Sequence, residues 1–322
     1  MPINVHPPLS IRPNSTERVG KTSVEDALSR VTVVVGIRLS RDRPHCAERL
    51  SYLLQWTSNY RLSDVIVVDT TPRANPRRLG LVQKCRRFGA AYHHQPSSLH
   101  SPSRVRNAGF RIARSRTSSH VLFLDVDVLG QKGALSRLAR HITEDRDFEW
   151  CPVIFTDEDN GLGTMKRFVQ DRCTSYTGPI YQKGYATGIH LISKRFWDKV
   201  GGYDEAFVGY GCEDIDMIHR ATALLGQREP SPRGSDYFED YRTTIPSDYR
   251  GYRLWMMEQK KHVSPNQMWV HFHHSRRAGS KYWEARKAND MRLRRKLSAF
   301  DESFPMLTTR ESFATPHAAS EG

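Results

Sequence analysis

The sequence lacks the features that mark several common classes of protein. It contains no run of roughly 18 or more apolar residues, which a membrane-spanning helix would require. Residues 1–23 are rich in Pro, Asn and Ser, and they contain no apolar stretch of the kind found in a secretory signal. We therefore expect a soluble, cytoplasmic protein.

Cysteine is scarce and irregularly spaced. The five cysteines include no CxxC pair. An odd number in a chain without a secretory signal is typical of reduced thiols rather than of a disulfide framework. We expect small, partly buried thiols at Cys46, Cys85, Cys151, Cys173 and Cys212.

Acidic residues are outnumbered by basic ones. Lys and Arg total 49 against 35 Asp and Glu, which gives a formal net charge of +14. Such an excess suits an anionic partner, whether nucleic acid, acidic lipid or a phosphorylated small molecule. Much of the excess lies in residues 275–297, where a solvated helix surface is the simpler explanation.

The first half of the chain alternates between expected strands and helices. Continuous apolar, β-branched runs predict buried strands at 31–37, 65–68 and 120–128, with a shorter strand at 90–94. Helical spacing predicts helices over 45–57, 76–88, 103–115 and from 129 to 142, the third of them capped by Ser103. This alternation implies βαβ units and a mostly parallel sheet.

The second half of the chain is less regular. The expected elements are a strand at 185–193, a helix at 213–225 and a short strand at 269–274, with turn-rich residues at 157–163 and an irregular insertion at 227–265. Residues 1–28 and 301–322 show no apolar periodicity. We therefore expect a flexible arm and a flexible tail on either side of one folded domain of residues 29–300.

Polar residues follow the ends of three expected strands. Parallel sheets bind ligands beyond the carboxyl ends of their strands, and Arg38, Asp69 and the pair Asp125 and Asp127 lie at or near such ends. Period-two alternation places both acids of the pair on one side, with Val126 facing the core. Burying these two carboxylates requires a cation or hydrogen-bond donors that compensate their negative charge. Mg²⁺ or Mn²⁺ would supply such a cation. A pair of exposed acids in a turn is the alternative.

A glycine-flanked aromatic residue precedes two acids at the start of an expected helix. Gly209 and Gly211 leave Tyr210 on a backbone with little cover, and Glu213 and Asp214 open the helix. The helix dipole stabilises acids there by a few tenths to about 1 kcal/mol, so the acids need no catalytic role. An aromatic ring beside carboxylates is nevertheless a usual arrangement for binding a sugar.

Histidines are concentrated in residues 271–274. On a strand His271 and His273 would share one face, whereas a turn after the strand would bring His271 and His274 together. Histidine suits first-row transition metals, although isolated histidines are usually ordinary surface or core residues. Their clustering downstream of an acidic strand end favours a metal-ligand role for at least one of them.

The order of these motifs resembles a known family of enzymes. A strand-end DxD, a Gly-aromatic-Gly segment with Glu-Asp opening a helix, and a histidine before SR are similar to the GT-A-fold inverting glycosyltransferases over residues 31–280. The likeness is to the β-1,4-galactosyltransferase type and to family 2 bacterial polysaccharide transferases of the chondroitin-polymerase kind. It implies an α/β fold with a mixed, mostly parallel sheet, a Rossmann-like nucleotide-sugar half at 29–150 and an acceptor and metal half at 151–300.

The resemblance also implies a role for each candidate residue. Asp214 would be the general base that deprotonates the acceptor. The implied ligands of a divalent ion, Mn²⁺ or Mg²⁺, are Asp127, His271 and His274. The residues implied to bind the nucleotide-sugar are Arg38, Asp69, Arg106, Asn107 and Asp125. The residues implied to bind the acceptor are Tyr210, Gly211 and Glu213.

The implied reaction is metal-dependent transfer of a sugar, with inversion, from a UDP-sugar to a hydroxyl of a saccharide or lipid-linked saccharide acceptor. Two departures from the family pattern leave the identity of the acceptor open, because Tyr210 replaces a tryptophan and Cys212 replaces a glycine. The insertion at 227–265 is absent from the animal enzymes, and it could form a lid over the acceptor.

Other functions would suit parts of the sequence. The basic stretch at 276–296 would suit nucleic-acid binding, but the carboxylate clusters would repel phosphate, so nucleic acid is not the expected partner. A nucleotidyltransferase would need a Gly-rich phosphate loop after the first strand, and GIRLSRDRP is not one. A catalytically silent relative is a third alternative. The basic residues at 281–297 could also hold the protein peripherally at the inner face of an anionic membrane.

Overall fold

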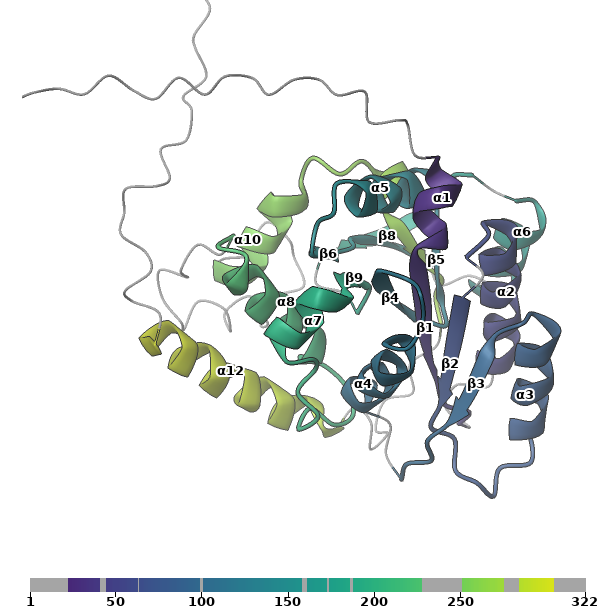
Figure 1. Ribbon diagram of the computed structural model, residues 1–322, viewed down its shortest axis with the longest axis horizontal. Helices are drawn as coiled ribbons and strands as arrows, with labels where there is room; N and C mark the ends of the chain where they lie inside the picture. Colours follow the sequence, from purple (N-terminus) through teal and green to yellow (C-terminus); the bar gives the residue numbers. More distant parts are fainter. Residues whose placement is uncertain are drawn as a thin grey trace, which may run out of the picture.

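Helices cover both faces of a central sheet (Figure 1). The computed structural model describes residues 23–40, 45–62, 64–98, 101–157, 161–172, 174–185, 188–227, 251–274 and 284–303. Within these residues the chain forms a six-stranded sheet and a four-stranded sheet. Both sheets contribute to one apolar core, which the helices of one face complete.

The six-stranded sheet is mixed and mostly parallel, as the sequence predicts. Its strand order is β3-β2-β1-β4-β9-β6. The first four are parallel to one another, and β9 runs antiparallel to both of its neighbours. The strands are β1 (Val31–Ile37), β2 (Asp64–Asp69), β3 (Ala91–His94), β4 (His120–Asp125), β6 (Phe148–Trp150) and β9 (His190–Ser193).

The four-stranded sheet shows that the expected strand at 120–128 was wrong in extent. The chain leaves the larger sheet after Asp125, turns, and enters the smaller sheet at Val128. A continuous apolar run cannot reveal this change of sheet, because Val126 within the turn and Val128 after it are both buried. The sheet order is β5-β10-β7-β8, formed by β5 (Val128–Gly130), β7 (Val153–Thr156), β8 (Ile180–Gly184) and β10 (Trp269–His271).

One face of the larger sheet packs against helices from the first half of the chain. Val33, Val35 and Ile37 of β1 contribute to this core. Trp56 packs there edge-on against Trp269 of β10, with ring centroids 5.8 Å apart. The helices are α1 (Val24–Ser29), α2 (Cys46–Asn59), α3 (Arg78–Arg87), α5 (Lys132–Thr143) and α6 (Gly161–Gln170), and a short 3-10 turn, η2 (Pro265–Gln267), packs against α5.

The opposite face packs mainly against helices from the second half. Val34 of β1 and Phe123 of β4 contribute here, and Phe110 stacks on Trp197 with ring centroids 4.1 Å apart. Leu293, on the inner side of the basic C-terminal helix, is buried in this core. The helices are α4 (Pro102–Ala113), α7 (Lys194–Val200), α8 (Glu213–Leu224), α10 (Gly251–Lys260) and α12 (Arg286–Ser303).

Several expected boundaries were wrong. The arm predicted at 1–28 ends in helix α1, which Ser23 and Asp26 start with reciprocal capping hydrogen bonds. Residues 161–163 of the turn-rich segment begin helix α6, and residues 251–260 of the insertion are helical. The cap of α4 is Ser101 rather than Ser103. The expected strands at 185–193 and 269–274 shorten to β9 and β10, and residues 1–22, 228–250 and 304–322 lie outside the described part.

The described cysteines are buried thiols, as predicted for Cys46, Cys85, Cys151 and Cys212. Cys173 lies outside the described residues. No helix among the described residues is long and apolar enough to cross a membrane.

Candidate active site

Three strands of the larger sheet end together at one edge. In the register of β1 with its neighbours, Ile37 pairs with Asp69 and Gly36 pairs with Asp125. The sequence-predicted residues Arg38, Asp69 and Asp125 therefore lie along the same edge, at the carboxyl ends where open parallel sheets bind ligands.

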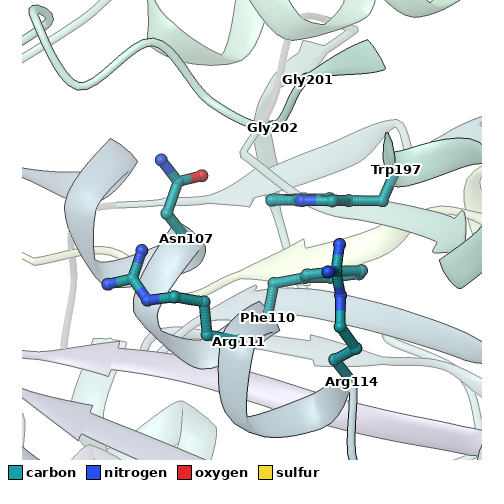
Figure 2. A pocket seen from close by; sticks show the side chains of 7 residues that line it. All are labelled: Asn107, Phe110, Arg111, Arg114, Trp197, Gly201 and Gly202. Atoms are coloured by element: carbon teal, nitrogen blue, oxygen red, sulfur yellow. The ribbon is translucent and has the colours of Figure 1, made fainter. Parts of the chain in front are cut away.

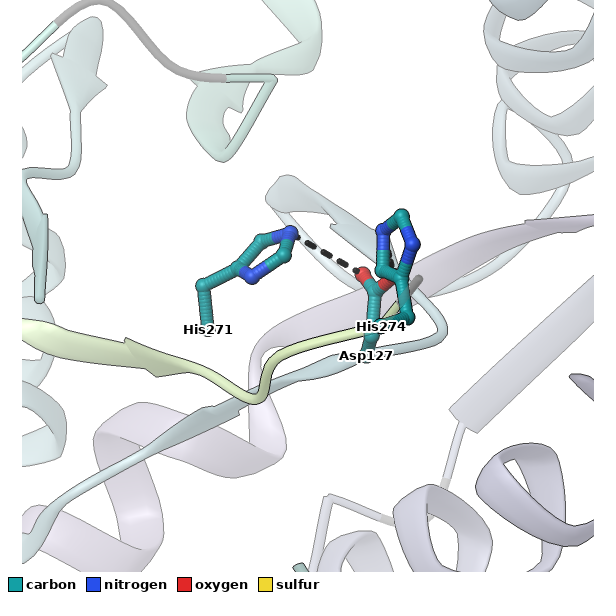
Figure 3. Close-up of side chains that lie close together, drawn as sticks. All are labelled: Asp127, His271 and His274. Atoms are coloured by element: carbon teal, nitrogen blue, oxygen red, sulfur yellow. Dashed lines mark ion pairs between the residues drawn. The ribbon is translucent and has the colours of Figure 1, made fainter. Parts of the chain in front are cut away.

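Asp127, His271 and His274 form a cluster that could hold a metal ion (Figure 3). One ligand atom from each lies within 4.8 Å of the others. Nε2 of His274 is 3.0 Å from Oδ2 of Asp127, and Nε2 of His271 is 3.7 Å from Oδ1. Two imidazoles and a carboxylate are a donor set that suits Mn²⁺ and other first-row divalent ions.

The turn after β10 creates this cluster. Strand geometry ends at His271, and the turn brings His274 beside Asp127, so the second of the two arrangements considered from the sequence is the one observed. The N–H of Phe272 donates to the Asp127 carbonyl at 2.9 Å. The N–H of His273 donates to Thr156 Oγ1 at 2.9 Å.

Arg49 supports the histidine segment, a contact that was not predicted from the sequence. Its guanidinium, buried on α2, donates to the carbonyls of Phe272 at 3.1 Å and His273 at 2.5 Å. On the other side of the segment, a Cβ on Gly161 would lie 2.0 Å from the His273 carbonyl oxygen, so α6 begins in direct contact with it. These contacts fix the backbone that carries both histidines.

Arg106 joins the strand-end acids to the acids of α8. Its guanidinium lies 3.4 Å from Asp125 Oδ1 and 3.1 Å from Glu213 Oε1. It also lies over the Tyr203 ring, 5.0 Å from the centroid. A Cβ on Gly188 would lie 2.1 Å from the guanidinium, so only glycine leaves room for this bridge. Asp125, 52% exposed, faces outward from it.

The two acids that open α8 differ in environment. Glu213 is buried, and burial together with the charge of Asp214 raises its pKa to about 7, against the opposing effect of Arg106. Asp214 is half-buried, and its Oδ1 accepts the N–H of Ile215 at 2.9 Å. A partly exposed carboxylate at this position can accept a proton from a bound hydroxyl.

Arg38 and Asp69, the residues predicted to hold uridine, organise the edge of the sheet. Arg38 donates to the carbonyls of Thr70, Ser97 and Ser98 at 2.7–3.0 Å. Asp69 is fully buried and accepts the N–H of Thr71 at 2.7 Å and the hydroxyl of Tyr92 at 2.6 Å. Both side chains thus shape the loops beyond the strands, and their contact with a nucleotide stays a prediction.

Asn107 faces away from the strand-end acids and towards the loop after α7. Its amide nitrogen donates to the Tyr203 carbonyl and to Glu205, each at 2.9 Å, and its oxygen accepts the Tyr203 N–H at 2.9 Å. It lines a pocket of about 270 Å³ (Figure 2) together with Phe110, Arg111, Arg114, Trp197, Gly201 and Gly202. Its predicted role at the diphosphate is untested by this geometry.

The aromatic residue of the predicted acceptor loop lies against the C-terminal helix. The guanidinium of Arg286 is 5.3 Å from the centroid of the Tyr210 ring. A Cβ on Gly211 would lie 2.7 Å from the same guanidinium. Only the net charge of this helix was visible in the sequence, so its contact with the loop was missed.

Two protein families match the chain. Residues 47–199 match glycosyl transferase family 2, and residues 171–239 match the family described as the N-terminal domain of galactosyltransferase. The first match contains Asp125 and Asp127 of the strand-end motif. The second contains Tyr210 and Asp214.

Individual proteins are more distant. The probable N-acetylgalactosaminyltransferase 9 of Caenorhabditis elegans is 24% identical over 193 residues, which cover 53% of this chain and 33% of that protein. Polypeptide N-acetylgalactosaminyltransferase 3 of Drosophila melanogaster is 26% identical over 153 residues, covering 40% and 23%. The matched part thus spans a third or less of these curated relatives.

Solved structures match the chain at lower identity and with low TM-scores. The catalytic domain of Drosophila β1,4-galactosyltransferase 7 with xylobiose is 13% identical, with a TM-score of 0.37 over 79% of this chain and 77% of that chain. A variant of that enzyme, solved with manganese, UDP-Gal and xylobiose, is 14% identical, with a TM-score of 0.33 over 79% of each chain.

Proposed function

Because the chain is a glycosyltransferase of the GT-A fold that uses a nucleotide-sugar, we propose that it moves a sugar from a UDP-sugar to a hydroxyl of a saccharide or lipid-linked saccharide. The proposed reaction depends on a divalent ion and inverts the anomeric centre. The edge of the sheet would hold the donor, and the loop before α8 would hold the acceptor.

One observation carries this proposal. Arg106 contacts Asp125 at the end of β4 and Glu213 at the start of α8, at 3.4 and 3.1 Å. The acids are distant in sequence, and each is explicable alone as an ordinary strand-end or helix-start residue. Their connection through one buried guanidinium supports a single site in which donor and acceptor elements meet.

The residues of the metal cluster fit a divalent ion. Asp127 is buried between two imidazoles, and neutral imidazole nitrogens with a carboxylate oxygen suit Mn²⁺. In the proposal Asp127, His271 and His274 hold this ion. When bound, it would neutralise charge that develops on the leaving diphosphate.

Asp214 is the proposed general base. It takes the proton of the acceptor hydroxyl as that oxygen forms a bond to the anomeric carbon, and the bond from the anomeric carbon to the diphosphate oxygen breaks on the opposite face. Glu213 and Tyr210 are proposed to bind the acceptor. Asp125 is proposed to contact the donor ribose and sugar, beside Arg106. Arg38 and Asp69 are proposed to hold the uracil end.

The test is a transfer assay with Asp214→Asn. With UDP-Gal, UDP-GalNAc, UDP-GlcNAc and UDP-Glc as donors and p-nitrophenyl glycosides as acceptors, we expect turnover to fall about a hundredfold or more, since general base catalysis contributes at least that much. Donor affinity, measured by calorimetry with Mn²⁺, should change little. Undiminished turnover in this variant would refute Asp214 as the base.

A second arm of the experiment addresses the metal. EDTA should abolish transfer, and Mn²⁺ or Mg²⁺ should restore it, since the leaving diphosphate otherwise lacks a compensating charge. Asp127→Asn should lose restoration by either ion. Full activity in the presence of chelator would contradict the metal-dependent mechanism.

A further inference from the structure

The acceptor loop, residues 208–212, has a conformation that its own sequence does not stabilise. Gly209 and Gly211 have φ angles of 75° and 97°, and Cys212 has a φ of 76°. Glycine adopts positive φ readily, whereas a residue with a Cβ is strained there. Cys212 is also the residue that immediately precedes α8 and its two acids. Something outside the loop must hold it.

Hydrogen bonds between α12 and three residues of the loop supply that support. The side-chain amide of Asn289 donates to the carbonyls of Val208 at 3.0 Å and Tyr210 at 3.1 Å. The thiol of Cys212 donates to Asp290 Oδ1 at 2.9 Å. Burial raises the pKa of this thiol, and the carboxylate of Asp290 raises it further although Arg286 opposes the shift, so the sulfur keeps its proton and remains a donor.

Arg286 completes the contact on the side of the aromatic ring. Its Nε donates to both oxygens of Asp290, at 2.9 and 3.2 Å, which orients the guanidinium over Tyr210. The electrostatic attraction between a guanidinium and the face of an aromatic ring ties the position of the Tyr210 ring to that of Arg286. The glycine at 211 permits this approach, because a Cβ there would collide with the guanidinium.

The helix itself is anchored independently of the loop. Leu293 and Leu297 are buried in the core. Lys296 forms ion pairs with Asp204 at 3.0 Å and with Asp216 of α8 at 2.6 Å. The inner face of α12 is thus fixed to the same helix whose first turn carries Glu213 and Asp214.

We propose that α12 is a structural part of the acceptor site, with Asn289 and Asp290 as positioning residues that hold the loop and Arg286 as a residue that sets acceptor specificity through Tyr210. The proposal rests on the proposed function in assigning the loop to the acceptor. In this proposal the inner face of α12 holds the acceptor loop in place, independently of what the outer face of the helix contacts.

The first test measures the loop without any substrate. Asn289→Asp preserves side-chain size but replaces the donor with an acceptor, so both hydrogen bonds to the loop are lost. We expect faster hydrogen exchange in peptides covering 203–214, with unchanged exchange in β1 and β4. Lys287→Ala, on the exposed side of the same helix, is the matched control and should leave the loop unchanged. Unchanged exchange in Asn289→Asp would overturn the proposal.

The second test separates acceptor binding from donor binding. With the donor and p-nitrophenyl glycoside that the wild type uses best, Asn289→Asp should raise the acceptor KM about tenfold or more, as expected for two lost hydrogen bonds. The donor KM, and the rate at which the enzyme hydrolyses the UDP-sugar in the absence of an acceptor, should stay within about twofold of the wild-type values. Arg286→Lys should change the ranking of acceptors, because an ammonium cannot stack as a guanidinium does.

The results of these experiments distinguish the proposed roles of α12 from the proposed function of the protein. A parallel rise in donor and acceptor KM would show a general loss of structure and would overturn the positioning role. An acceptor ranking unchanged in Arg286→Lys would overturn the specificity role. If the wild type neither binds a UDP-sugar nor releases UDP, the proposed function fails, while the exchange measurement still decides whether α12 holds the loop.

Discussion

Arg49 illustrates how a single buried cation can prepare a metal site that it does not touch. It donates to the backbone carbonyls of Phe272 and His273, between the two histidines of the cluster. Arginine can satisfy both carbonyls at once because its planar guanidinium presents several donors in fixed directions. Loss of these donors would remove the side-chain hydrogen bonds to both carbonyls and free the segment to move.

We therefore predict that Arg49→Met weakens metal binding. Groups outside the ligand shell that orient ligands typically change metal affinity 10- to 100-fold, so the Kd for Mn²⁺ should rise about tenfold or more. Titration followed by electron paramagnetic resonance measures this Kd without any substrate. Arg61→Met, at an exposed arginine paired with Glu25, is the control. Equal Kd values for Arg49→Met and the wild type would contradict the prediction.

His141 is buried beside an anionic side chain that two cations already compensate. Its Nδ1 lies 3.8 Å from Glu149 Oε2, and Glu149 Oε1 pairs with Arg137 at 2.5 Å and Lys260 at 2.7 Å. Burial lowers the pKa of His141 from 6.5 to about 4, although Glu149 opposes the shift. The unfolded chain therefore binds more protons than the folded one between these two values.

The stability contributed by neutral His141 should be present above pH 6.5 and lost as the pH falls towards 4. At pH 5 the loss amounts to about 2 kcal/mol. Glu213, with its raised pKa, has the opposite slope below pH 7, so the informative quantity is the difference between wild type and His141→Gln. Urea unfolding at pH 7.5 and 5.0 should show the penalty of the variant shrinking by about 2 kcal/mol at the lower pH. A penalty that is the same at both values would refute the shift.

Helix α4 packs so closely on the sheet that there is no room for a methyl group at Gly109. A Cβ on Gly109 would lie 2.2 Å from Val34 Cγ1 in β1, and rigid packing leaves little room for adjustment. Gly80 in α3 provides a comparison, since a Cβ there meets nothing within 4 Å. Both glycines lie inside helices, so the gain in helix propensity from alanine is the same.

Gly109→Ala should destabilise the fold by about 1–3 kcal/mol through overpacking. Gly80→Ala should stabilise it by up to about 1 kcal/mol, because alanine restricts the unfolded chain and favours the helix. The midpoint of urea unfolding measures both changes. If the two variants shift the midpoint in the same direction, the close packing of α4 on β1 is not a constraint.

Elements differ in how far the sequence determines them. β1, β2 and α8 were predicted within a few residues. The continuous apolar runs of β1 and β2 arise from burial on both faces of the sheet, and the helical spacing of α8 arises from burial of one of its sides. The run from His120 to Val128 failed as one strand because it belongs to two sheets, and apolarity is the same in both. Helix α1 was missed because only Ala27 and Leu28 are buried in it, too few to create a period.

The candidate site follows the same division. Asp125, Asp127 and Asp214 lie at the ends of strands or helices, so their placement could be inferred from the elements that precede or follow them. Arg49 and Asn289 could not be inferred, because Arg49 acts on backbone carbonyls 223–224 residues away and Asn289 on carbonyls 79–81 residues away. Such contacts leave no local pattern, since any backbone offers the same acceptor.

At the scale of the whole molecule, the basic residues that give the net charge of +14 differ in what they contact. The inner face of α12 packs against the acceptor loop and α8, but Lys287, Arg294 and Arg295 are exposed on its outer side. Met291, 49% exposed, lies among them. A row of basic residues with an apolar side chain suits an anionic membrane surface, and a lipid-linked acceptor would reside at such a surface.

We propose on this basis a peripheral contact of the outer face of α12 with anionic lipid at the inner face of a membrane. The protein should co-sediment with phosphatidylserine-containing vesicles and not with neutral ones, and salt should weaken the binding through screening. Each basic residue contributes about 1 kcal/mol at such a surface, so Lys287→Gln combined with Arg295→Gln should lower the vesicle partition coefficient about tenfold or more. Arg86→Gln with Arg87→Gln, an equal loss of exposed charge on α3 across the sheet, should lower it much less. Equal losses for the two pairs would assign the binding to net charge alone, and the outer face of α12 would then have no special part in it.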